Sequence, residues 1–256
     1  MMDLSLIIPV KNEAGNIQPL VCEIRSALDD FLTYEILFID DGSDDGTAAE
    51  VGLVAAELPN VKLLCHARSF GQSAAIRTGV KAARADWIAT IDGDGQNDPA
   101  DLPRLWRVGM ANDGAPVLVN GYRRNRHDSF SKRWASRIAN AVRSRCLGDS
   151  TPDAGCGLKL FSRALFLDLP YFDHMHRFLP ALVLREGGKV HSMVVNHRPR
   201  RGGVSKYGVC DRLGVGIVDL VGVMWLTRRA KHPHLLDEAA IVAAPGSAPR
   251  VVSLSR

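Results

Sequence analysis

Short apolar runs alternate with helix-like segments along the first half of the chain. Between the runs, apolar residues recur every three or four positions, as they do along one face of an amphipathic helix. The runs predict β-strands at 4–10, 35–39, 61–65, 87–91 and 116–119. The helical spacing predicts α-helices at 17–28, 48–58, 74–85 and 102–110. This alternation is typical of an α/β fold with a mainly parallel central sheet that is flanked by helices on both faces.

The second half of the chain is basic and has no such alternation. Eight Lys and Arg residues lie within 122–145, against the single acidic residue Asp128. A second basic stretch begins at Arg198 and leads into the apolar segment 213–226, which further cations follow. We expect residues 233–256, which are rich in Ala, Pro and Ser, to be disordered.

Length and composition narrow the class of protein. With 256 residues, of which 46% are apolar and 23% charged, the chain can bury a core without disulfides or a structural metal. The five cysteines have no CxxC spacing, which disfavours a zinc site and fits a reducing cytosol. The apolar segment 213–226 is shorter than the ~20 residues of a spanning helix, and it contains Asp219. We therefore expect no transmembrane span and, because Met1–Val10 lacks a basic n-region, no signal peptide.

Acidic residues follow several of the expected strands. Glu13 comes shortly after the first strand, Asp40 and Asp41 follow the second, and Asp92 and Asp94 follow the fourth. Ligands of parallel α/β sheets bind at the carboxyl ends of the strands, so these residues should share one edge of the sheet. Like charges gathered there are unfavourable unless a cation or a hydrogen-bonding ligand offsets them.

Asp92 and Asp94 have a spacing that suits a divalent metal. Two carboxylates one residue apart can bind Mg²⁺ or Mn²⁺, which prefer oxygen ligands. A solvated turn is the alternative for Asp92–Asp94, and a helix N-cap is the alternative for the acidic residues after the second strand. An EF-hand is excluded because Asn97 and Pro103 stand where it needs Gly and Glu. Neither a P-loop nor a dinucleotide-binding glycine motif occurs.

The order and spacing of these motifs resemble the inverting family 2 glycosyltransferases, which have the GT-A fold. The resemblance covers roughly residues 4–212 and is carried by Ile8–Glu13, Asp40–Ser43, Gly71–Gly79 and Asp92–Asp94. Within this family the chain is most similar to the polyprenyl-phosphate sugar transferases, such as dolichol-phosphate mannosyltransferase and its bacterial undecaprenyl-phosphate relatives. The narrower similarity lies in 92–99, 121–123, 153–159, 177–182 and 197–207.

The resemblance implies a role for individual residues. It implies a nucleotide-sugar pocket lined by Pro9, Lys11, Glu13, Ile39, Asp41, Gly93 and Gln96. It implies a Mg²⁺ or Mn²⁺ ion held on the donor diphosphate by Asp92, Asp94 and Gln96. The acceptor phosphate would be bound by Arg123, Arg137, Arg200, Ser205 and Lys206. The catalytic residues would be Asp92, Asp94, Arg123 and Asp153. Two roles are open for Asp153, a general base and a loop carboxylate paired with a nearby arginine.

The expected reaction moves one sugar from a GDP- or UDP-linked donor to a polyprenyl phosphate, with inversion at the anomeric carbon. A phosphate monoester has a second pKa of ~6 and is largely ionised at neutral pH, so this acceptor needs no general base. One alternative is a family 2 enzyme with a soluble or cell-surface glycan as acceptor. The other is a nucleotide-sugar-binding protein without catalysis. Nucleic acid is not an expected partner, because few aromatic residues accompany the basic ones.

The expected organisation has three parts. Residues 1–206 would form the catalytic domain, with the nucleotide sugar bound by 1–120 and the acceptor by 121–206. Residues 207–232 would form an amphipathic helix, anchored by Trp225, that associates peripherally with the cytoplasmic face of the inner membrane. A core helix, or a helix that packs against a second copy of the chain, is the alternative for this segment.

Overall fold

The computed structural model describes residues 2–112, 116–124, 142–199, 209–231, 235–236 and 251–252. The first half contains β1 (Leu4–Val10), α1 (Ile17–Leu28), β2 (Tyr34–Asp40), α2 (Thr47–Glu57), β3 (Val61–Cys65), α3 (Gln72–Ala82), β4 (Trp87–Thr90), α4 (Leu102–Met110) and β5 (Val117–Tyr122). The second half contains β6 (Lys159–Ser162), α6 (Arg163–Asp168), α7 (Leu179–Arg185), β7 (Lys189–Val194) and α8 (Val209–Arg228). Short 3₁₀ helices lie at Pro99–Asp101 and Met175–Arg177.

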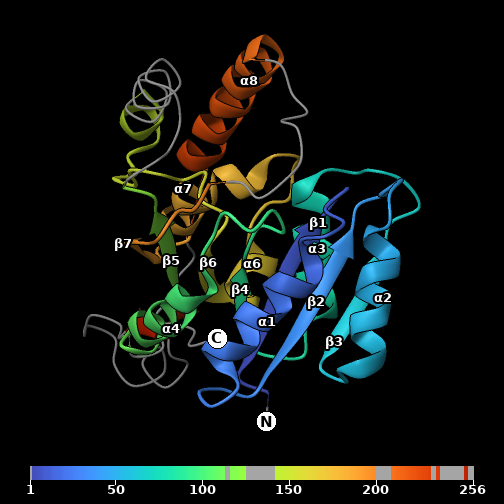
Figure 1. The fold of residues 1–256 in the computed structure, drawn as a ribbon. Coiled ribbons are helices and arrows are strands. Elements are labelled where there is room, and N and C mark those ends of the chain that lie inside the picture. Colours follow the sequence, from blue (N-terminus) through green and yellow to red (C-terminus); the bar gives the residue numbers. More distant parts are fainter. Residues whose placement is uncertain are drawn as a thin grey trace, which may run out of the picture.

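A seven-stranded sheet forms the centre of the fold, in the order β3-β2-β1-β4-β6-β5-β7 (Figure 1). Neighbouring strands are parallel, except that β6 runs antiparallel to both β4 and β5. The predicted α/β fold with a mainly parallel sheet is therefore confirmed. The apolar pattern does not predict β6, because this strand has four residues and begins with a lysine.

Helices cover both faces of the sheet because side chains alternate in direction along each strand. On β1, Leu6 and Ile8 share a core with the buried face of α1, whereas Ile7 shares the opposite core with α3 and α7. Helix α3 lies close to the sheet at Gly79, where a β-carbon would come within 2.6 Å of Ile7 Cγ2. The two cores fix the strand ends that carry the acidic loops.

Helix α8 packs against α7 and leaves an apolar face exposed. Val223 is fully buried, and Asp219 Oδ2 lies 3.0 Å from His174 Nδ1. The outward face carries four large apolar residues that are 58–71% exposed: Ile217, Val218, Val221 and Trp225. Helix α8 lies within the segment 207–232 and carries apolar residues on its docked side and on its outward side, while the role expected for this segment stays a prediction. No helix in the described residues is both long enough and apolar enough to cross a bilayer.

Residues 233–256 are expected to be disordered, and the structure describes two short pieces of this tail. Strand β8 (Leu235–Leu236) pairs antiparallel with β9 (Val251–Val252). The remaining residues after 231 lie outside the described part of the chain.

Candidate active site

The carboxyl ends of β1, β2 and β4 meet at one edge of the sheet, as adjacent parallel strands require. Val10 pairs with Asp40, and the Asp41 N–H donates to the Val10 carbonyl at 2.9 Å. Asp92 follows β4 on the other side of β1. The acidic loops after the first, second and fourth strands therefore leave the sheet side by side.

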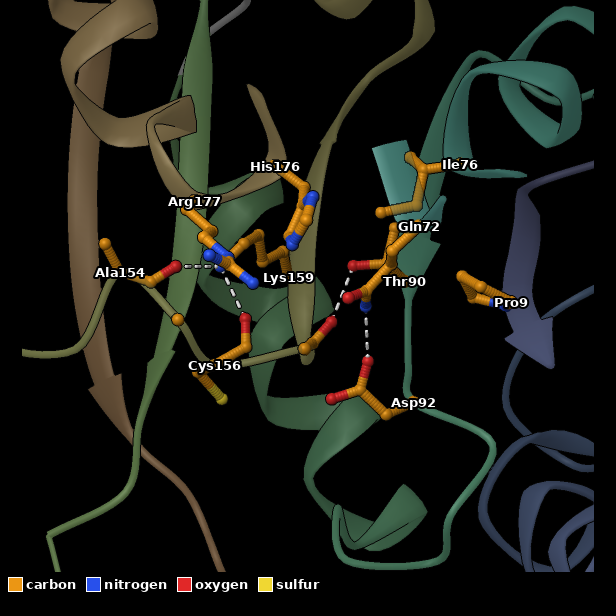
Figure 2. A pocket seen from close by; sticks show the side chains of 12 residues that line it. Pro9, Gln72, Ile76, Thr90, Asp92, Ala154, Cys156, Lys159, His176 and Arg177 are labelled. Atoms are coloured by element: carbon orange, nitrogen blue, oxygen red, sulfur yellow. Dashed lines mark hydrogen bonds between the residues drawn. The ribbon is translucent and has the colours of Figure 1, made fainter. Parts of the chain in front are cut away.

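Asp92 is held between α3 and the loop that precedes β6 (Figure 2). Gln72 Nε2, at the start of α3, donates to Asp92 Oδ1 at 2.9 Å. Gly157 faces the same carboxyl group so closely that a β-carbon on residue 157 would overlap it. Desolvation by the surrounding protein and repulsion from Asp94 raise the pKa of Asp92 to about 6. A cation beside this carboxylate would offset both effects.

Asp94 and its neighbouring glycine complete the acidic loop. Gly93 has no room for a side chain, because its β-carbon would come within 2.6 Å of Val10 Cγ1. The Gln96 backbone N–H donates to Asp94 Oδ1 at 3.1 Å and fixes the turn. Within the described residues, no three His, Cys, Asp or Glu side chains gather as a metal site of their own. The two carboxylates of Asp92 and Asp94 suit Mg²⁺ or Mn²⁺ because such ions commonly bind one or two carboxylates together with substrate phosphates.

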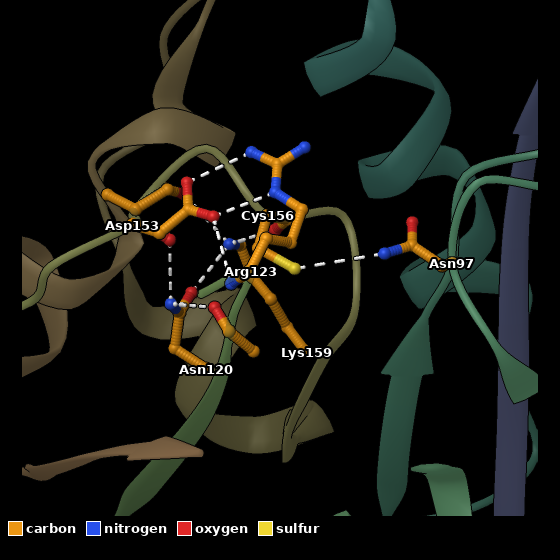
Figure 3. A network of polar contacts seen from close by, with 8 residues as sticks. Asn97, Asn120, Arg123, Asp153, Cys156 and Lys159 are labelled. Carbon is orange, nitrogen blue, oxygen red and sulfur yellow. Dashed lines mark hydrogen bonds and ion pairs between the residues drawn. The ribbon is translucent and has the colours of Figure 1, made fainter. Parts of the chain in front are cut away.

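An ion pair joins the end of β5 to the loop before β6 (Figure 3). Arg123 Nε donates to Asp153 Oδ2 at 2.7 Å, and Nη2 donates to Oδ1 at 2.9 Å. Both side chains are largely buried. Pairing with an arginine, one of the two roles considered for Asp153, is thus present. Its role as a general base stays a prediction.

Three polar side chains in one row of the sheet hold the loop 153–157. Thr90 on β4 pairs with Lys159 on β6, and Lys159 pairs with Asn120 on β5. Lys159 Nζ also donates to Asn120 Oδ1 at 2.7 Å. The row donates to backbone carbonyls of the loop: Asn120 to Asp153 at 2.9 Å, Lys159 to Ala154 at 2.9 Å and Cys156 at 2.5 Å, and Thr90 to Gly157 at 2.7 Å. These three side chains therefore hold the loop that faces Asp92 through its backbone carbonyls.

Asp41 is buried and organises the loop that follows β3. Its carboxylate accepts hydrogen bonds from Ser69 Oγ at 2.7 Å and from the N–H groups of Phe70 and Gly71 at 2.8 and 2.9 Å. Burial alone would raise the pKa of Asp41, but these hydrogen bonds and that of His66 hold it below its ordinary value. The part of Asp41 in nucleotide binding stays a prediction.

The other residues predicted for the nucleotide-sugar pocket lie in different surroundings. Pro9 lines the same pocket as Asp92. Lys11 and Glu13 are half-buried in the loop after β1, where Glu13 accepts a hydrogen bond from Asn16 at 2.9 Å. The Ile39 side chain is fully buried in the core under α3 and is not among the pocket residues. Any contact of Ile39 with a nucleotide would therefore come from its backbone.

Four residues predicted to bind the acceptor phosphate lie outside the described residues: Arg137, Arg200, Ser205 and Lys206. Arg198, shortly before this segment, pairs with Glu23 at 2.7 Å and with Asp98 at 2.6 Å. Its backbone N–H donates to the Gln96 carbonyl at 2.9 Å. The segment predicted to bind the acceptor phosphate thus follows a residue, Arg198, whose backbone is hydrogen-bonded to the loop of Asp94.

Motif reasoning missed several polar residues that build this site: Gln72, Thr90, Asn120, Lys159 and His176. Their chemistry depends on partners from distant parts of the chain, which spacing alone does not reveal. One signal was present, since Lys159 stands between Leu158 and Leu160 in an otherwise apolar run. A charged residue there is buried, and it therefore has to be hydrogen-bonded.

Comparison with known proteins identifies the family. Residues 5–169 match the family model of Glycosyl transferase family 2. The chain belongs to this family. The family 2 glycosyltransferase described here is 36% identical over 240 residues to dodecaprenyl-phosphate galacturonate synthase of Rhizobium johnstonii, covering 91% of this chain and 69% of that protein. It is 34% identical over 227 residues to undecaprenyl-phosphate 4-deoxy-4-formamido-L-arabinose transferase of Aeromonas hydrophila, covering 88% of this chain and 68% of that protein.

Solved structures agree on the fold. Glucosyl-3-phosphoglycerate synthase of Mycobacterium tuberculosis, in complex with UDP, has a TM-score of 0.67 at 19% identity, covering 93% of this chain and 84% of that one. The same synthase crystallised with Mn²⁺, UDP-glucose and glycerol 3-phosphate has a TM-score of 0.66. The expected GT-A fold of this glycosyltransferase is therefore confirmed.

Proposed function

We propose that this family 2 glycosyltransferase transfers one sugar from a nucleotide-sugar donor to a polyprenyl phosphate at a membrane surface. The observation that carries the proposal is its similarity, over 91% and 88% of the chain, to two polyprenyl-phosphate sugar transferases. These relatives are named for different sugars, galacturonate and formamido-arabinose, and for the same class of acceptor. We therefore infer the class of acceptor for this chain from these relatives, but not the sugar.

The donor diphosphate would lie beside Asp92 and Asp94. A Mg²⁺ or Mn²⁺ ion bound there would neutralise the charge that develops on the leaving nucleoside diphosphate. The chain orients both carboxylates in advance, since Gln72 holds Asp92 and the Gln96 backbone holds Asp94. Such preorganisation lowers the cost of binding and of the reaction.

The acceptor phosphate would approach on the side of Arg123. Arginine recognises phosphate through several N–H groups in a fixed plane, and the two bonds to Asp153 set that plane. An ionised phosphate is already a nucleophile, so the reaction needs positioning and charge stabilisation rather than proton removal. An Asp153 that is bound to Arg123 fits this requirement better than a free base would.

The outward face of α8 supports contact with a membrane. Its exposed apolar residues include Trp225, a residue type that favours the bilayer interface. Arg228, Arg229 and Lys231 follow at the end of the helix, where they would meet anionic lipid headgroups. We infer that α8 lies on the cytoplasmic face of the inner membrane and brings the active site to the lipid acceptor.

The test is a reaction of the full chain with undecaprenyl phosphate in detergent and Mn²⁺. The donor panel would hold UDP-galacturonate, UDP-glucose, UDP-N-acetylglucosamine, UDP-arabinose derivatives and GDP-mannose, with the lipid product identified by mass. We expect one donor to add a single sugar, chelation to stop the reaction and Mn²⁺ to restore it. Asp94→Asn should abolish turnover, whereas Asp86→Asn, at the exposed opposite end of β4, should not. Metal-dependent nucleotide binding without any lipid product would point to a different acceptor.

A further inference from the structure

His176 extends its imidazole ring into the pocket that Asp92 borders (Figure 2). It lies on the 3₁₀ helix Met175–Arg177, far in sequence from the acidic loops. An isolated histidine most often has a structural role. The hydrogen bonds of His176 show whether its ring can also bind a ligand.

Ser73 on α3 fixes the tautomer of this ring. The His176 backbone N–H donates to Ser73 Oγ at 3.3 Å, and the same Oγ lies 2.7 Å from His176 Nδ1. Among the hydrogen bonds of the described residues, Nδ1 is the acceptor available to the Ser73 proton. We therefore assign Nδ1 as the acceptor of the Ser73 proton, which leaves the proton of the neutral ring on Nε2.

The ring is neutral at physiological pH. Burial, together with the nearby charges of Arg177, Lys159 and His174, holds the pKa of His176 well below its ordinary value. A neutral ring with a proton on Nε2 donates one hydrogen bond and carries no net charge. Such a donor suits a hydroxyl oxygen, whereas a phosphate oxygen is better matched by a cation.

Lys159 borders the same pocket but does not compete for that role. Its ammonium group has three protons, and three oxygen atoms of the protein accept them. The pocket thus places a neutral donor, His176, opposite the Asp92 carboxylate. A sugar attached to a diphosphate at Asp92 would have its hydroxyl groups on the His176 side.

We propose that His176 is a binding residue for the donor sugar, with its Nε2–H donating to a sugar hydroxyl, and that Ser73 is the positioning residue that orients the ring. This inference rests on the proposed function, because it assumes a nucleotide-sugar donor at Asp92. It separates sugar recognition by His176 from diphosphate recognition by the acidic loop.

The test compares the binding of nucleotide sugars with the binding of UDP and GDP alone, by calorimetry with Mn²⁺ on the full chain. His176→Ala should lower the affinity for the nucleotide sugar that the wild type binds most tightly. The expected loss is about 10-fold, the effect of one buried hydrogen bond, while the affinity for the nucleotide alone should change by less than about 2-fold. His176→Gln, whose amide N–H reaches the position of Nε2, should restore most of the sugar-dependent affinity. His176→Asn, whose amide reaches only the position of Nδ1, should not.

Each contrary result has a distinct meaning. If His176→Ala lowers the affinity for nucleotide and for nucleotide sugar equally, His176 does not contact the sugar. If the affinity for the nucleotide sugar is unchanged, His176 does not contact the donor at all. Rescue by Asn but not by Gln would show that only the contact with Ser73 matters. His191→Ala, on β7 and bonded to Asn112, is the matched control and should bind as the wild type does. A wild-type protein that binds no nucleotide sugar would contradict the proposed function itself.

Discussion

Gly157 lies against the carboxyl group of Asp92 with no space for even one further carbon atom. A β-carbon on residue 157 would overlap Asp92 Oδ1, Oδ2 and Cγ. The glycine belongs to the loop that Thr90, Asn120 and Lys159 hold by its carbonyls, so it cannot easily retreat. The position of the Asp92 carboxylate is therefore limited by a residue 65 positions away in the sequence.

Gly157→Ala should disable the site without unfolding the protein. The added methyl group displaces Asp92, and a shift of ~1 Å in a catalytic group can cost about 100-fold in rate. We expect Mn²⁺ affinity, measured by calorimetry, and kcat/KM to fall together. Gly155→Ala adds the same methyl group to the same loop, where the nearest atoms would be 3.8 Å away. Mn²⁺ affinity equal in both variants would contradict the steric argument.

Metal binding should depend on pH through Asp92. Its pKa is raised to about 6, so in the metal-free protein the carboxylate gives up its proton as the pH rises through that value. Only the ionised form binds a cation, and Mn²⁺ affinity should therefore increase from about pH 5 to about pH 7 and then level off. Asp94→Asn removes the like charge and should move the midpoint to lower pH. A flat profile in the wild type would contradict the raised pKa.

The same shift has a consequence for stability. The folded state of the metal-free protein binds a proton at Asp92 more tightly than the unfolded state does. Protonation therefore stabilises the fold at low pH, and this contribution is lost as the pH rises through about 6. Added Mn²⁺ should raise the melting temperature at pH 7 by more than at pH 5, as measured by circular dichroism.

Lys159 should be necessary for the stability of the loop. Lys159→Met keeps most of the side-chain volume but leaves the Asn120 amide oxygen and two backbone carbonyls without their donor. Each buried unpaired group costs about 1–3 kcal/mol, so the free energy of unfolding should fall by about 3 kcal/mol or more. Lys81→Met, on the exposed side of α3, should change it by less than about 0.5 kcal/mol. Urea denaturation of both variants distinguishes a buried structural lysine from a surface one.

The outward face of α8 should control membrane binding. Val218 is 71% exposed on α8, and Leu53 is equally exposed on α2. Val218→Asp should lower binding to phosphatidylglycerol vesicles by about 10-fold or more, because burial of one such side chain contributes ~1.5–3 kcal/mol. Leu53→Asp should leave vesicle binding unchanged. Equal loss in both variants, or loss in neither, would remove α8 as the membrane contact.

Much of the fold and part of the site follow from sequence pattern. The strands at 4–10, 35–39, 61–65 and 87–91 stand within one residue of their observed bounds. Strands β1, β2 and β4 are largely buried apolar runs, whereas β3, at the edge of the sheet, is only partly buried. Their order along the chain also predicts that Asp41, Asp92 and Asp94 lie at one edge, since βαβ units place successive carboxyl ends together.

The remaining part of the site depends on contacts that no local pattern encodes. Strand β6 is inserted antiparallel between β4 and β5, and this pairing buries Lys159 beside Asn120 and Thr90. His176 is held at the pocket by hydrogen bonds with Ser73, which lies about a hundred residues earlier. Both depend on tertiary pairing across the sheet and between helices. Composition and spacing therefore indicate the acidic loop Asp92–Asp94 but not the residues that support it.

The choice of nucleophile distinguishes a phosphate acceptor from a hydroxyl acceptor. The full chain, Mn²⁺ and the active nucleotide sugar would be incubated in parallel with undecaprenyl phosphate and with undecaprenol, which lacks the phosphate. We predict a lipid heavier by one sugar with undecaprenyl phosphate and no product with undecaprenol. A phosphate is already ionised and Arg123 would position it, whereas the hydroxyl group of undecaprenol would first have to lose a proton. Equal glycosylation of the alcohol, or transfer to a soluble glycan but to neither lipid, would contradict a polyprenyl phosphate acceptor.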